Sequence, residues 1–349
     1  MVIFDCERMK YPNTGLYSFC ENLGKALIAR SLHYKNIEFG MYVPKKLIGH
    51  FGPDCHYQKK HTLDKICFYN PKITLWHSTY QLSHYMPIRT PIIQTIHDLN
   101  FLFENPSPAR ISKYTKRIDR NLKRLSHIIA ISEFTKQELL CHFNIDIPID
   151  VIYNGCNEYT GEVLEPIRKP RRPFLFTIGT VIPKKNFHVL PCLLQGNNYE
   201  LIIAGICNKE YVREIIKEAH VWKVEDRIHL IGAITEPEKH WYLQNCKAFL
   251  FPSIAEGFGL PVIEAMQYGK PVFISDHTSL PEIGGEFAYY FNHDFDRHKM
   301  QQEFENGLDD FEKGGKNPSQ IKEHALSFSW ETAAKKYWEI YKQFGSPQK

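Results

Sequence analysis

The residues from Phe251 to Ser275, FPSIAEGFGLPVIEAMQYGKPVFIS, constrain the fold of this chain more than any other stretch. A short apolar run leads into a loop with two glycines, and Leu260-Pro261 is typical of a helix start, because proline there lacks only an N–H that would be unpaired anyway. Gly269 and Pro271 end the helix, and a second apolar run follows. We therefore expect a strand–loop–helix–strand unit, whose loop lies where parallel sheets bind phosphate groups.

Two glutamates flank this loop. Glu256 lies in the loop, and Glu264 lies inside the predicted helix. Neighbours on one helical face are three or four residues apart, and these two glutamates do not have that spacing. Carboxylates accept hydrogen bonds from vicinal hydroxyls, so one glutamate can bind a sugar and the other a ribose, with a diphosphate between them at the helix start. Alternatively, Glu256 complements the helix dipole and Glu264 is a solvated surface residue. The presence of both glutamates around GFGLP favours the ligand interpretation.

The motif EGFGLP at 256–261, followed by IEAM at 263–266 and GKPV at 269–272, resembles the E-x7-E signature of family 4 retaining glycosyltransferases. The resemblance is dense through the C-terminal half and weaker in the N-terminal half. It implies the GT-B fold, which is an α/β architecture of two Rossmann-like doubly wound domains facing an interdomain cleft. In that family the first glutamate faces the donor sugar and the second binds the nucleotide ribose. The resemblance assigns these roles to Glu256 and Glu264, and it places these further residues in the nucleotide-sugar site: Gly257, Phe258, Gly259 and Leu260.

Two lysines follow the apolar run FLFTIGT, before a helix that we expect near Asn186. A lysine at the carboxyl end of a strand can neutralise a diphosphate as a point charge. The resemblance places Lys185 at the family's phosphate-binding lysine. Many members carry an arginine directly after the preceding glycine, where this chain has Thr180. We therefore expect Lys185, together with Lys184, to carry more of the charge neutralisation.

The N-terminal half contributes two further site candidates. His97 follows the apolar run PIIQTI, and Gly15 stands where the first predicted strand enters its helix. A histidine after a strand is more often structural, and a lone glycine serves any tight turn. The resemblance favours function for both, because the family places a histidine against the donor sugar and a glycine loop near the acceptor and the donor phosphates. His77 ends another strand in the same manner, with less specific support.

The chain is too long for one compact core, since single domains typically have about 100–200 residues. Short apolar runs alternate with amphipathic segments, which predicts parallel sheets covered by helices. We expect an N-terminal acceptor-side domain at 1–160 and a proline-rich, basic linker at 161–173. A nucleotide-sugar-binding domain should occupy 174–327, and a C-terminal helix at 328–349 should cross back to the N-terminal domain.

Composition excludes several classes of protein. The net charge of +4 does not indicate a nucleic-acid binder. Nine cysteines without a C-x-x-C motif argue against a disulfide framework or a structural zinc site and suggest a reducing compartment. The chain begins with a strand-like MVIFD and has no apolar run of roughly 20 residues, so we expect a cytoplasmic protein. Asp294-Phe295-Asp296 spells a metal-binding D-x-D, but the resemblance implies a metal-independent reaction without a cofactor.

A basic stripe runs along the predicted helix at 109–125. Its members recur at steps of three and four: Arg110, Lys113, Arg117, Arg120 and Arg124. Such a stripe is typical of a solvated face. The alternative is peripheral attraction to the anionic inner face of the cytoplasmic membrane, worth about 1 kcal/mol per basic residue. Such attraction would bring the protein close to a lipid-linked acceptor.

These observations predict a retaining glycosyltransferase that transfers a hexose to a glycan or lipid-linked glycan acceptor in cell-surface polysaccharide synthesis. The run at 179–186 resembles bacterial mannosyltransferases of polysaccharide assembly, which makes GDP-mannose the expected donor. UDP-glucose, UDP-galactose and UDP-N-acetylglucosamine stay open. So do epimerisation or hydrolysis of a sugar nucleotide, which need no acceptor, and a catalytically silent partner, which would tolerate loss of Glu256 and Lys185.

Overall fold

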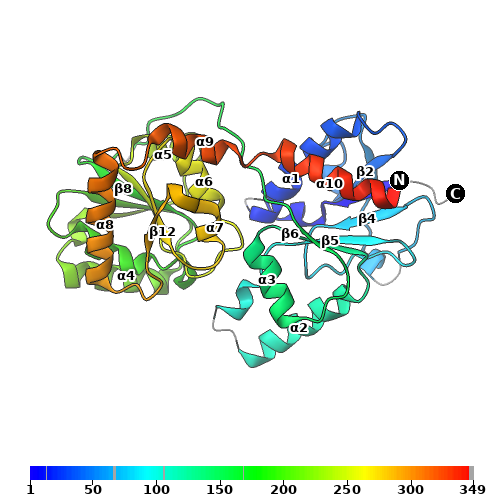
Figure 1. Cartoon of the computed structure of the whole chain (residues 1–349), viewed down its shortest axis with the longest axis horizontal. Helices are drawn as coiled ribbons and strands as arrows, with labels where there is room; N and C mark the ends of the chain where they lie inside the picture. Colours follow the sequence, from blue (N-terminus) through cyan, green and yellow to red (C-terminus); the bar gives the residue numbers. More distant parts are fainter. Residues whose placement is uncertain (13, 66–67, 105–106, 168, 346–349) are drawn as a thin grey trace. The chain divides into compact units, whose positions relative to one another are not determined.

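The computed structural model describes residues 1–12, 14–65, 68–104, 107–167 and 169–345. The chain forms two compact units, one made of Met1–Gly155 together with the segment from Phe328 onward, and the other of Cys156–Ser327. Each unit is built on one parallel sheet with helices on both faces (Figure 1). The predicted α/β class with two doubly wound sheets is confirmed.

The first sheet has the strand order β3-β2-β1-β4-β5-β6-β7. Its central strands are fully buried, as expected of a parallel sheet that is covered on both faces. The strands are β1 (Val2–Asp5), β2 (Phe39–Val43), β3 (His56–Lys59), β4 (Leu75–Ser78), β5 (Ile92–Ile96), β6 (His127–Ala130) and β7 (Ile149–Val151). The order reverses between β1 and β4, which makes the carboxyl ends of these two strands the topological switch point of the sheet.

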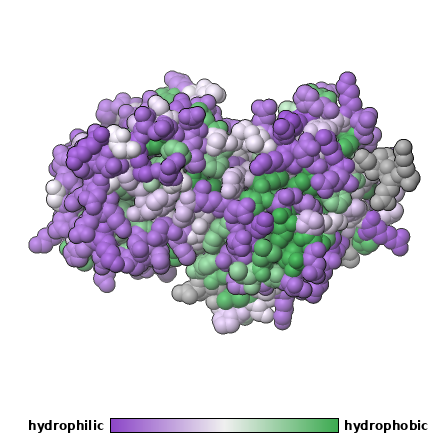
Figure 2. All heavy atoms as spheres, viewed as in Figure 1, coloured by the Kyte–Doolittle hydropathy of each residue, from purple (hydrophilic) through white to green (hydrophobic). Residues whose placement is uncertain are grey.

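The helices of the first unit are α1 (Gly15–Ser31), α2 (Pro108–Leu122), α3 (Glu133–His142) and α10 (Trp330–Gly345), with short 3-10 turns η1 (Glu7–Lys10), η2 (Lys45–Leu47), η3 (Thr62–Lys65) and η4 (Asn100–Leu102). In the view of Figure 2, hydrophobic residues gather on this unit over β5, β6 and α3. Partly buried isoleucines before and within the edge strand β7, at 145, 147 and 149, pack against the core beneath.

The C-terminal helix α10 belongs to the first unit. Trp338 is fully buried, its Nε1 donates to the carbonyl of Leu27 in α1 at 3.1 Å, and Tyr34 stacks on its indole at 4.6 Å. The chain leaves this unit at Gly155 and returns at Phe328. A Cβ at Gly155 would lie 2.1 Å from the backbone nitrogen of Trp330, so only glycine fits where the departing and returning segments meet.

The boundary between the two units differs from the prediction. We expect an N-terminal domain up to residue 160 and a linker at 161–173, but the N-terminal part of the first unit stops at Gly155 and the following segment, including 161–173, belongs to the second unit. The backbone N–H of Leu164 donates to the carbonyl of Pro237 at 3.4 Å, and that of Arg171 donates to the Glu200 carboxylate at 3.2 Å. Prolines and basic residues removed the periodicity that would mark a helix or strand, but an irregular segment can still be fixed by backbone hydrogen bonds.

The second sheet has the order β10-β9-β8-β11-β12-β13, with its switch point between β8 and β11. The strands are β8 (Phe174–Ile178), β9 (Glu200–Ala204), β10 (Ile228–Gly232), β11 (Ala248–Phe251), β12 (Val272–Ser275) and β13 (Tyr289–Phe291). The helices are α4 (Lys209–Trp222), α5 (Glu236–Asn245), α6 (Leu260–Met266), α7 (Leu280–Gly284), α8 (Arg297–Glu312) and α9 (Pro318–Leu326), with 3-10 segments η5 (Pro183–Lys185), η6 (Phe187–Leu194), η7 (Glu225–Arg227) and η8 (Gly285–Phe287).

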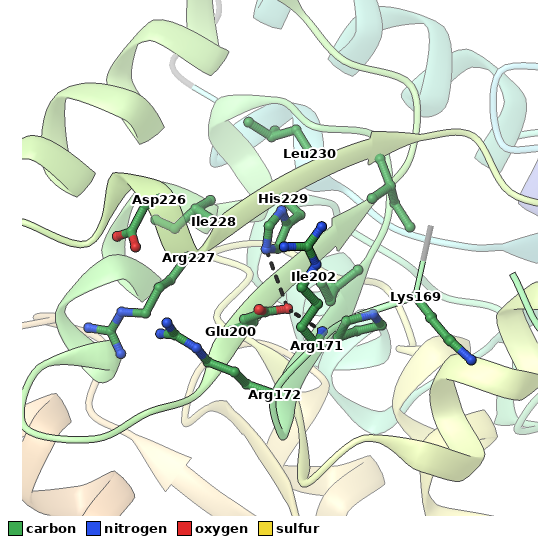
Figure 3. Close-up of a pocket in the computed structure, with 12 residues that line it drawn as sticks. Lys169, Arg171, Arg172, Glu200, Ile202, Asp226, Arg227, Ile228, His229 and Leu230 are labelled. Atoms are coloured by element: carbon green, nitrogen blue, oxygen red, sulfur yellow. Dashed lines mark hydrogen bonds and ion pairs between the residues drawn. The ribbon is translucent and has the colours of Figure 1, made fainter. Parts of the chain in front are cut away.

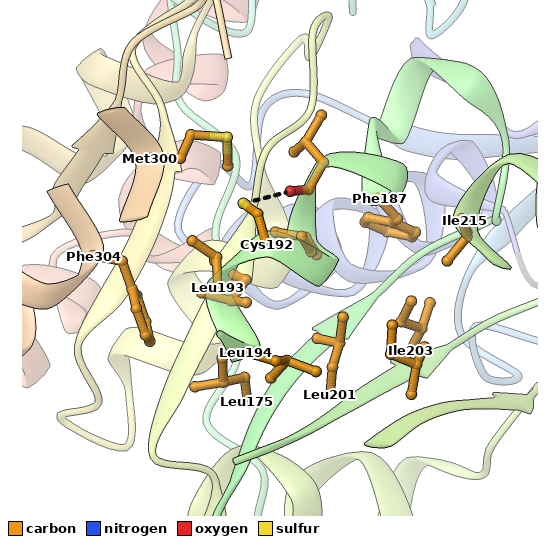
Figure 4. Close-up of a cluster of buried hydrophobic side chains, with 14 of the residues drawn as sticks. Leu175, Phe187, Cys192, Leu193, Leu194, Leu201, Ile203, Ile215, Met300 and Phe304 are labelled. Carbon is orange, nitrogen blue, oxygen red and sulfur yellow. Dashed lines mark hydrogen bonds between the residues drawn. The ribbon is translucent and has the colours of Figure 1, made fainter. Parts of the chain in front are cut away.

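The helix that we expect near Asn186 is the 3-10 segment η6. Asn186 adopts a left-handed φ of 58°, and Pro191 inside the segment has no N–H for the α-helical pattern. The segment is nevertheless firmly anchored, since Phe187 and Leu194 are fully buried on the sheet with Leu201 (Figure 4). This core fixes the chain immediately after Lys185.

His77, a lesser candidate from the sequence, has a structural role. Its Nδ1 lies 2.5 Å from the Tyr341 hydroxyl of α10, and its Nε2 lies 2.7 Å from Thr95 Oγ1 of β5. The side chain is fully buried, and this burial lowers its pKa to about 3. The neutral imidazole therefore ties the C-terminal helix to the sheet and is not available to a ligand.

Replacing His77 tests this role through pH. Below pH 6.5, His77 is protonated in the unfolded chain, whereas in the folded chain it stays neutral until the pH approaches 3. His77 therefore makes the free energy of unfolding decrease as the pH falls through this window. Between pH 7 and pH 5 this contribution is about 2 kcal/mol. We expect His77→Gln to be less stable than the wild type at pH 7 and to lack this dependence, as measured by urea unfolding at both pH values.

Asp5 makes the free energy of unfolding increase as the pH falls, because burial raises its pKa to about 8. The effect of His77 is therefore taken from the difference in pH dependence between the wild type and His77→Gln. His56→Gln is the matched control, since His56 is exposed on β3 and solvated in both states. A wild-type pH dependence retained in full by His77→Gln would contradict the assignment.

Candidate functional site

Lys185 and Glu256 meet at the switch point of the second sheet. Lys185 Nζ lies 2.6 Å from Glu256 Oε1, although the two residues are 71 positions apart in the sequence. Lys185 ends η5, which follows β8, and Glu256 lies in the loop after the neighbouring strand β11. Both side chains are largely buried, with 14% and 13% of their surface exposed. Two residues that the sequence analysis assigned to the site are therefore brought together.

The Glu256 loop is held by hydroxyl groups that sequence reasoning missed. Ser253 Oγ donates to Glu256 Oε1 at 2.5 Å, the Glu256 N–H donates to Thr278 Oγ1 at 3.2 Å, and Ser279 Oγ lies 3.0 Å from the Glu256 carbonyl. Ser253 follows β11, and Thr278 and Ser279 follow β12. Their position just beyond the carboxyl ends of neighbouring strands was the signal that could have identified them.

Two glycines allow close packing of the backbone beside Lys185. A Cβ at Gly179, at the end of β8, would lie 3.3 Å from Lys185 Cε. Gly205, at the end of β9, has a φ of +136°, and a Cβ there would lie 1.9 Å from the Gly179 carbonyl oxygen. Lys185 Nζ also lies 4.6 Å from the ring centroid of Phe251, within the range of a cation–π contact. Its position is therefore fixed by close backbone packing on one side and an aromatic ring on another.

Lys184 and Thr180 have different settings from Lys185. The carbonyl of Lys184 accepts the Ile254 N–H at 3.0 Å and the Ser253 hydroxyl at 3.2 Å, which ties the η5 loop to the Glu256 loop. Thr180 is exposed directly after β8. Both lie on the same edge of the sheet as Lys185.

The glycine loop turns sharply into α6. Gly257, Phe258 and Gly259 are buried, and Gly259 caps the helix with a left-handed φ of +112°. A Cβ on Gly259 would lie 2.9 Å from Leu280 Cδ2. The helix begins at Leu260 as predicted but ends at Met266, and a turn that closes at Gly269 follows. The predicted helix end was therefore three residues too late.

Glu264 has a cationic partner that the sequence did not reveal. Lys239 Nζ of α5 lies 2.7 Å from Glu264 Oε1 of α6 and 2.7 Å from Glu236 Oε2. Burial alone would lower the Lys239 pKa, but the two carboxylates raise it above its ordinary value, so the ammonium stays charged. No motif marks Lys239, because a lysine on an amphipathic helix is usually solvated.

His97 and Gly15 belong to the first unit. His97 Nε2 lies 3.0 Å from the Thr79 carbonyl, and its ring packs edge-on against Phe19 at 4.6 Å. Burial lowers its pKa to about 4, so the imidazole is neutral near pH 7. Because only a protonated nitrogen can donate to that carbonyl, Nε2 carries the hydrogen and Nδ1 is an acceptor. Gly15 begins α1 as predicted, and a Cβ there would meet open space.

A separate cavity of about 660 Å³ lies along the edge strand β10 of the second unit (Figure 3). It starts at the amino ends of β9 and β10, whereas Lys185 and Glu256 lie at carboxyl ends. Within its lining, Arg227 donates to the carbonyls of Leu194 and Asn197, and Glu200 lies 3.4 Å from His229 Nε2. Open parallel sheets bind their ligands outside the carboxyl ends of the strands. We therefore place the candidate site at Lys185 and Glu256.

The D-x-D sequence has a local structural role. Asp294 Oδ2 lies 2.8 Å from Lys299 Nζ, and Asp296 caps α8 by accepting the Lys299 N–H at 3.0 Å. Among the residues that the structure describes, no group of three or more His, Cys, Asp or Glu side chains is arranged to hold a metal ion. Within the same residues, every helix is too short or too polar to cross a membrane.

The Glu264–Lys239 pair yields a stability test. Lys239→Met leaves the Glu264 carboxylate without its cation, which we expect to cost roughly 2–3 kcal/mol, less than a fully buried pair because Glu264 is partly exposed. Adding Glu264→Gln should restore part of the loss. Glu236→Gln is the control, expected to cost less than about 1 kcal/mol because Glu236 is 68% exposed. Urea unfolding of the single and double variants gives the coupling energy between Lys239 and Glu264. Equal losses of stability in Lys239→Met and Glu236→Gln would contradict the importance of this pair.

The two halves of the chain match two family models. Residues 164–327 match "Glycosyl transferases group 1", and residues 47–158 match "Glycosyltransferase Family 4". The first match contains the glycine loop, Lys185, Glu256 and Glu264, and the second contains His97.

Several curated relatives are mannosyltransferases. The serotype-specific mannosyltransferase WbdA of Escherichia coli is 30% identical over 61% of this chain and 28% of the relative. The O-antigen chain mannosyltransferase RfbU of Salmonella typhimurium is 26% identical, over 60% of this chain and 59% of the relative. The O-antigen chain mannosyltransferase B of E. coli is 25% identical, over 82% and 84%. The chain thus spans less than two thirds of the first two relatives.

Solved structures of low sequence identity share the fold. Sucrose-phosphate synthase from Thermosynechococcus elongatus superposes with a TM-score of 0.75 at 17% identity, covering 98% of both chains. HepE from Anabaena, solved in complex with UDP and glucose, has a TM-score of 0.71 at 16% identity and covers 98% of this chain and 99% of its own. Fold, motif and family matches agree: the chain belongs to the glycosyltransferases that these two family models describe.

Proposed function

We propose that this protein transfers a hexose, with retention of configuration, from a nucleotide sugar to a glycan or lipid-linked glycan acceptor in cell-surface polysaccharide synthesis. GDP-mannose is the donor that we favour. The Lys185–Glu256 pair at the switch point of the second sheet carries this proposal, because it sets a cation and a carboxylate where a sugar diphosphate needs both. The names of the mannosyltransferase relatives support the choice of sugar.

Lys185 stabilises the leaving group in the proposed reaction. When the bond between the anomeric carbon and the diphosphate oxygen breaks, negative charge builds on the departing diphosphate. Lys185 donates one N–H to Glu256, and its other N–H groups can reach phosphate oxygens. A preorganised donor of this kind is worth about 3–4 kcal/mol to the transition state.

Glu256 binds the donor sugar. Its bonds from Lys185 and Ser253 both fall on Oε1, so Oε2 can accept a sugar hydroxyl. The carboxylate also offsets the positive charge that develops at the anomeric carbon. In the first unit, the neutral His97 keeps Nδ1 as an acceptor, which suits a sugar hydroxyl.

Glu264 binds the nucleotide ribose. Lys239 holds its Oε1, which orients the carboxylate and leaves Oε2 to accept the ribose hydroxyls. The acceptor oxygen then attacks the anomeric carbon on the face from which the diphosphate leaves, and its proton passes to the departing phosphate. This route requires no separate protein base.

A UDP-sugar is the second candidate donor. The favouring observation is that HepE, whose fold this chain shares, was solved with UDP and glucose. Epimerisation or hydrolysis of the nucleotide sugar would differ from transfer by yielding product without any acceptor.

A panel of nucleotide sugars tests the proposal by thermal unfolding. A ligand at a hundred times its dissociation constant should stabilise the protein by about 2.7 kcal/mol. We expect GDP-mannose to give the largest shift, and a larger shift with a UDP-sugar would change the donor. Failure of every nucleotide sugar to stabilise the protein would contradict the proposal.

Two substitutions test the roles at the switch point. Lys185→Ala and Glu256→Gln should each lower kcat/KM by roughly 100- to 1000-fold, because each removes charge complementarity in the transition state. Lys217→Ala, which removes an exposed lysine of α4, is the control and should leave kcat/KM unchanged. Sugar transfer measured with the preferred donor gives the comparison. Activity of Lys185→Ala close to that of the control would refute the role of Lys185.

A further inference from the structure

A basic cavity of about 480 Å³ lies within the first unit, and none of its lining residues is assigned above to the nucleotide-sugar site. Its lining combines aromatic and cationic side chains and contains no aspartate or glutamate. The cationic members are Arg8, Lys113, Lys116, Arg117 and Arg120. Five positive charges around one concave space indicate an anionic ligand that carries more than one negative charge.

The cavity lies at the switch point of the first sheet. Arg8 is in η1, shortly after β1, and Tyr80 follows β4, and these two strands are neighbours where the strand order reverses. Open parallel sheets bind their ligands at this point, outside the carboxyl ends of the strands. The helix α2 supplies the other wall. The cavity therefore occupies the ligand-binding position of its sheet.

The cations are held in place without carboxylate partners. The Arg8 guanidinium lies 4.2 Å above the Tyr80 ring and 4.8 Å from the Tyr11 ring, and its Nε is buried with no hydrogen-bond partner among the described residues. The nearby Glu7 carboxylate is already paired with Lys10 and Lys60. Arg8 is thus positioned by stacking, and its N–H groups can bind an anion bidentately.

On the opposite wall, Arg117 Nη1 lies 2.6 Å from His84 Nδ1. Burial and the neighbouring Arg117 lower the His84 pKa, so the imidazole is neutral near pH 7. Its Nδ1 accepts from the guanidinium, which leaves Nε2 as a further N–H donor at the cavity.

The basic residues of the stripe on α2 fall into those that line the cavity and those that do not. Arg124 donates to the carbonyls of Met86 and Pro87, so it braces a loop, and Arg110 lies 3.9 Å from Glu104. Lys113, Arg117 and Arg120, between them, line the cavity. The basic residues of the stripe therefore have different surroundings, and three of them line one cavity.

We propose that this cavity binds a phosphate or diphosphate group, carried by the acceptor. A single carboxylate would leave most of the five positive charges unmatched, whereas a diphosphate offers several anionic oxygens to the Arg8 fork and to the lysines. Anion binding follows from the cavity alone; the acceptor as carrier rests on the proposed function.

Inorganic pyrophosphate is the probe, titrated by calorimetry with GDP and UDP in excess to occupy the nucleotide site. The double variant Lys113→Ala/Arg120→Ala removes two exposed cations from the cavity. Arg110→Ala/Lys123→Ala removes two exposed cations from the same helix and its C-cap, outside the cavity. We expect about tenfold weaker pyrophosphate binding in the cavity variant, since two charge-assisted hydrogen bonds are lost, and less than about a twofold change in the control. Equal losses in both variants, no loss in the cavity variant, or no binding to the wild type would overturn the proposal.

Vesicle flotation identifies the carrier of the phosphate. Vesicles of phosphatidylglycerol with phosphatidylcholine are compared with phosphatidylcholine alone. If the cavity variant loses anionic-vesicle binding and the control keeps it, the cavity takes lipid phosphate and the acceptor as carrier is overturned. If both variants bind vesicles like the wild type while pyrophosphate binding falls only in the cavity variant, the acceptor is supported.

Nucleotide-sugar binding keeps this test independent of the proposed function. The cavity variant should retain the thermal shift with the preferred nucleotide sugar, because neither Lys113 nor Arg120 is assigned to the nucleotide-sugar site. If no nucleotide sugar shifts the wild type, the proposed function fails, while the pyrophosphate comparison still decides whether the cavity binds an anion. Arg8→Lys adds a second readout: it keeps the charge but removes the guanidinium fork, so pyrophosphate affinity should fall without loss of the thermal shift.

Discussion

The ion pair between Lys185 and Glu256 depends on a constraint that organises the whole second unit: neighbouring parallel strands deliver their following loops to one edge of the sheet. Removing both charges from water is costly, and their attraction offsets this only with good geometry and further hydrogen bonds. Ser253 supplies one such bond, and the close packing of Gly205 on Gly179 fixes the backbone beside the lysine. The closely packed backbone and the additional hydrogen bond therefore help to offset the desolvation cost of the pair.

The second carboxylate is arranged in the same way. Glu264 is paired with Lys239, as Glu256 is paired with Lys185, so each glutamate of the motif has a cation within 2.7 Å. A cation beside a carboxylate holds it in one orientation and keeps it ready to accept hydrogen bonds from hydroxyls. A donor that binds here meets two oriented carboxylates without having to order them itself, which preserves binding energy for the transition state.

In the first unit, loops after neighbouring parallel strands also meet at one edge of the sheet, but they bring together different side chains. At its switch point, cations of η1 and α2 line a cavity whose described lining contains no aspartate or glutamate, and burial lowers the pKa values of His77 and His97, which are neutral. His77 uses this neutrality to bind Tyr341 and Thr95 in the core, whereas His97 is held by the Thr79 carbonyl at a strand end. Two histidines in similar sequence settings therefore have different partners, and the contacts with Tyr337 and Tyr341 of α10 distinguish His77.

The amino-acid sequence by itself determined the features that depend on local pattern. The alternation of apolar and amphipathic segments indicated the two parallel α/β sheets, and the glycine and proline positions indicated the loop and the start of α6. The E-x7-E motif singled out Glu256 and Glu264, and the loop after FLFTIGT singled out Lys185. Only the tertiary structure decided which groups surround them: Lys239 beside Glu264, Ser253 beneath Glu256, residues 161–173 in the second unit, and the cavity that divides the basic stripe of α2. The reason is physical: backbone conformation and periodicity are encoded by neighbours along the chain, whereas the partner of a side chain is set by packing between segments far apart in sequence.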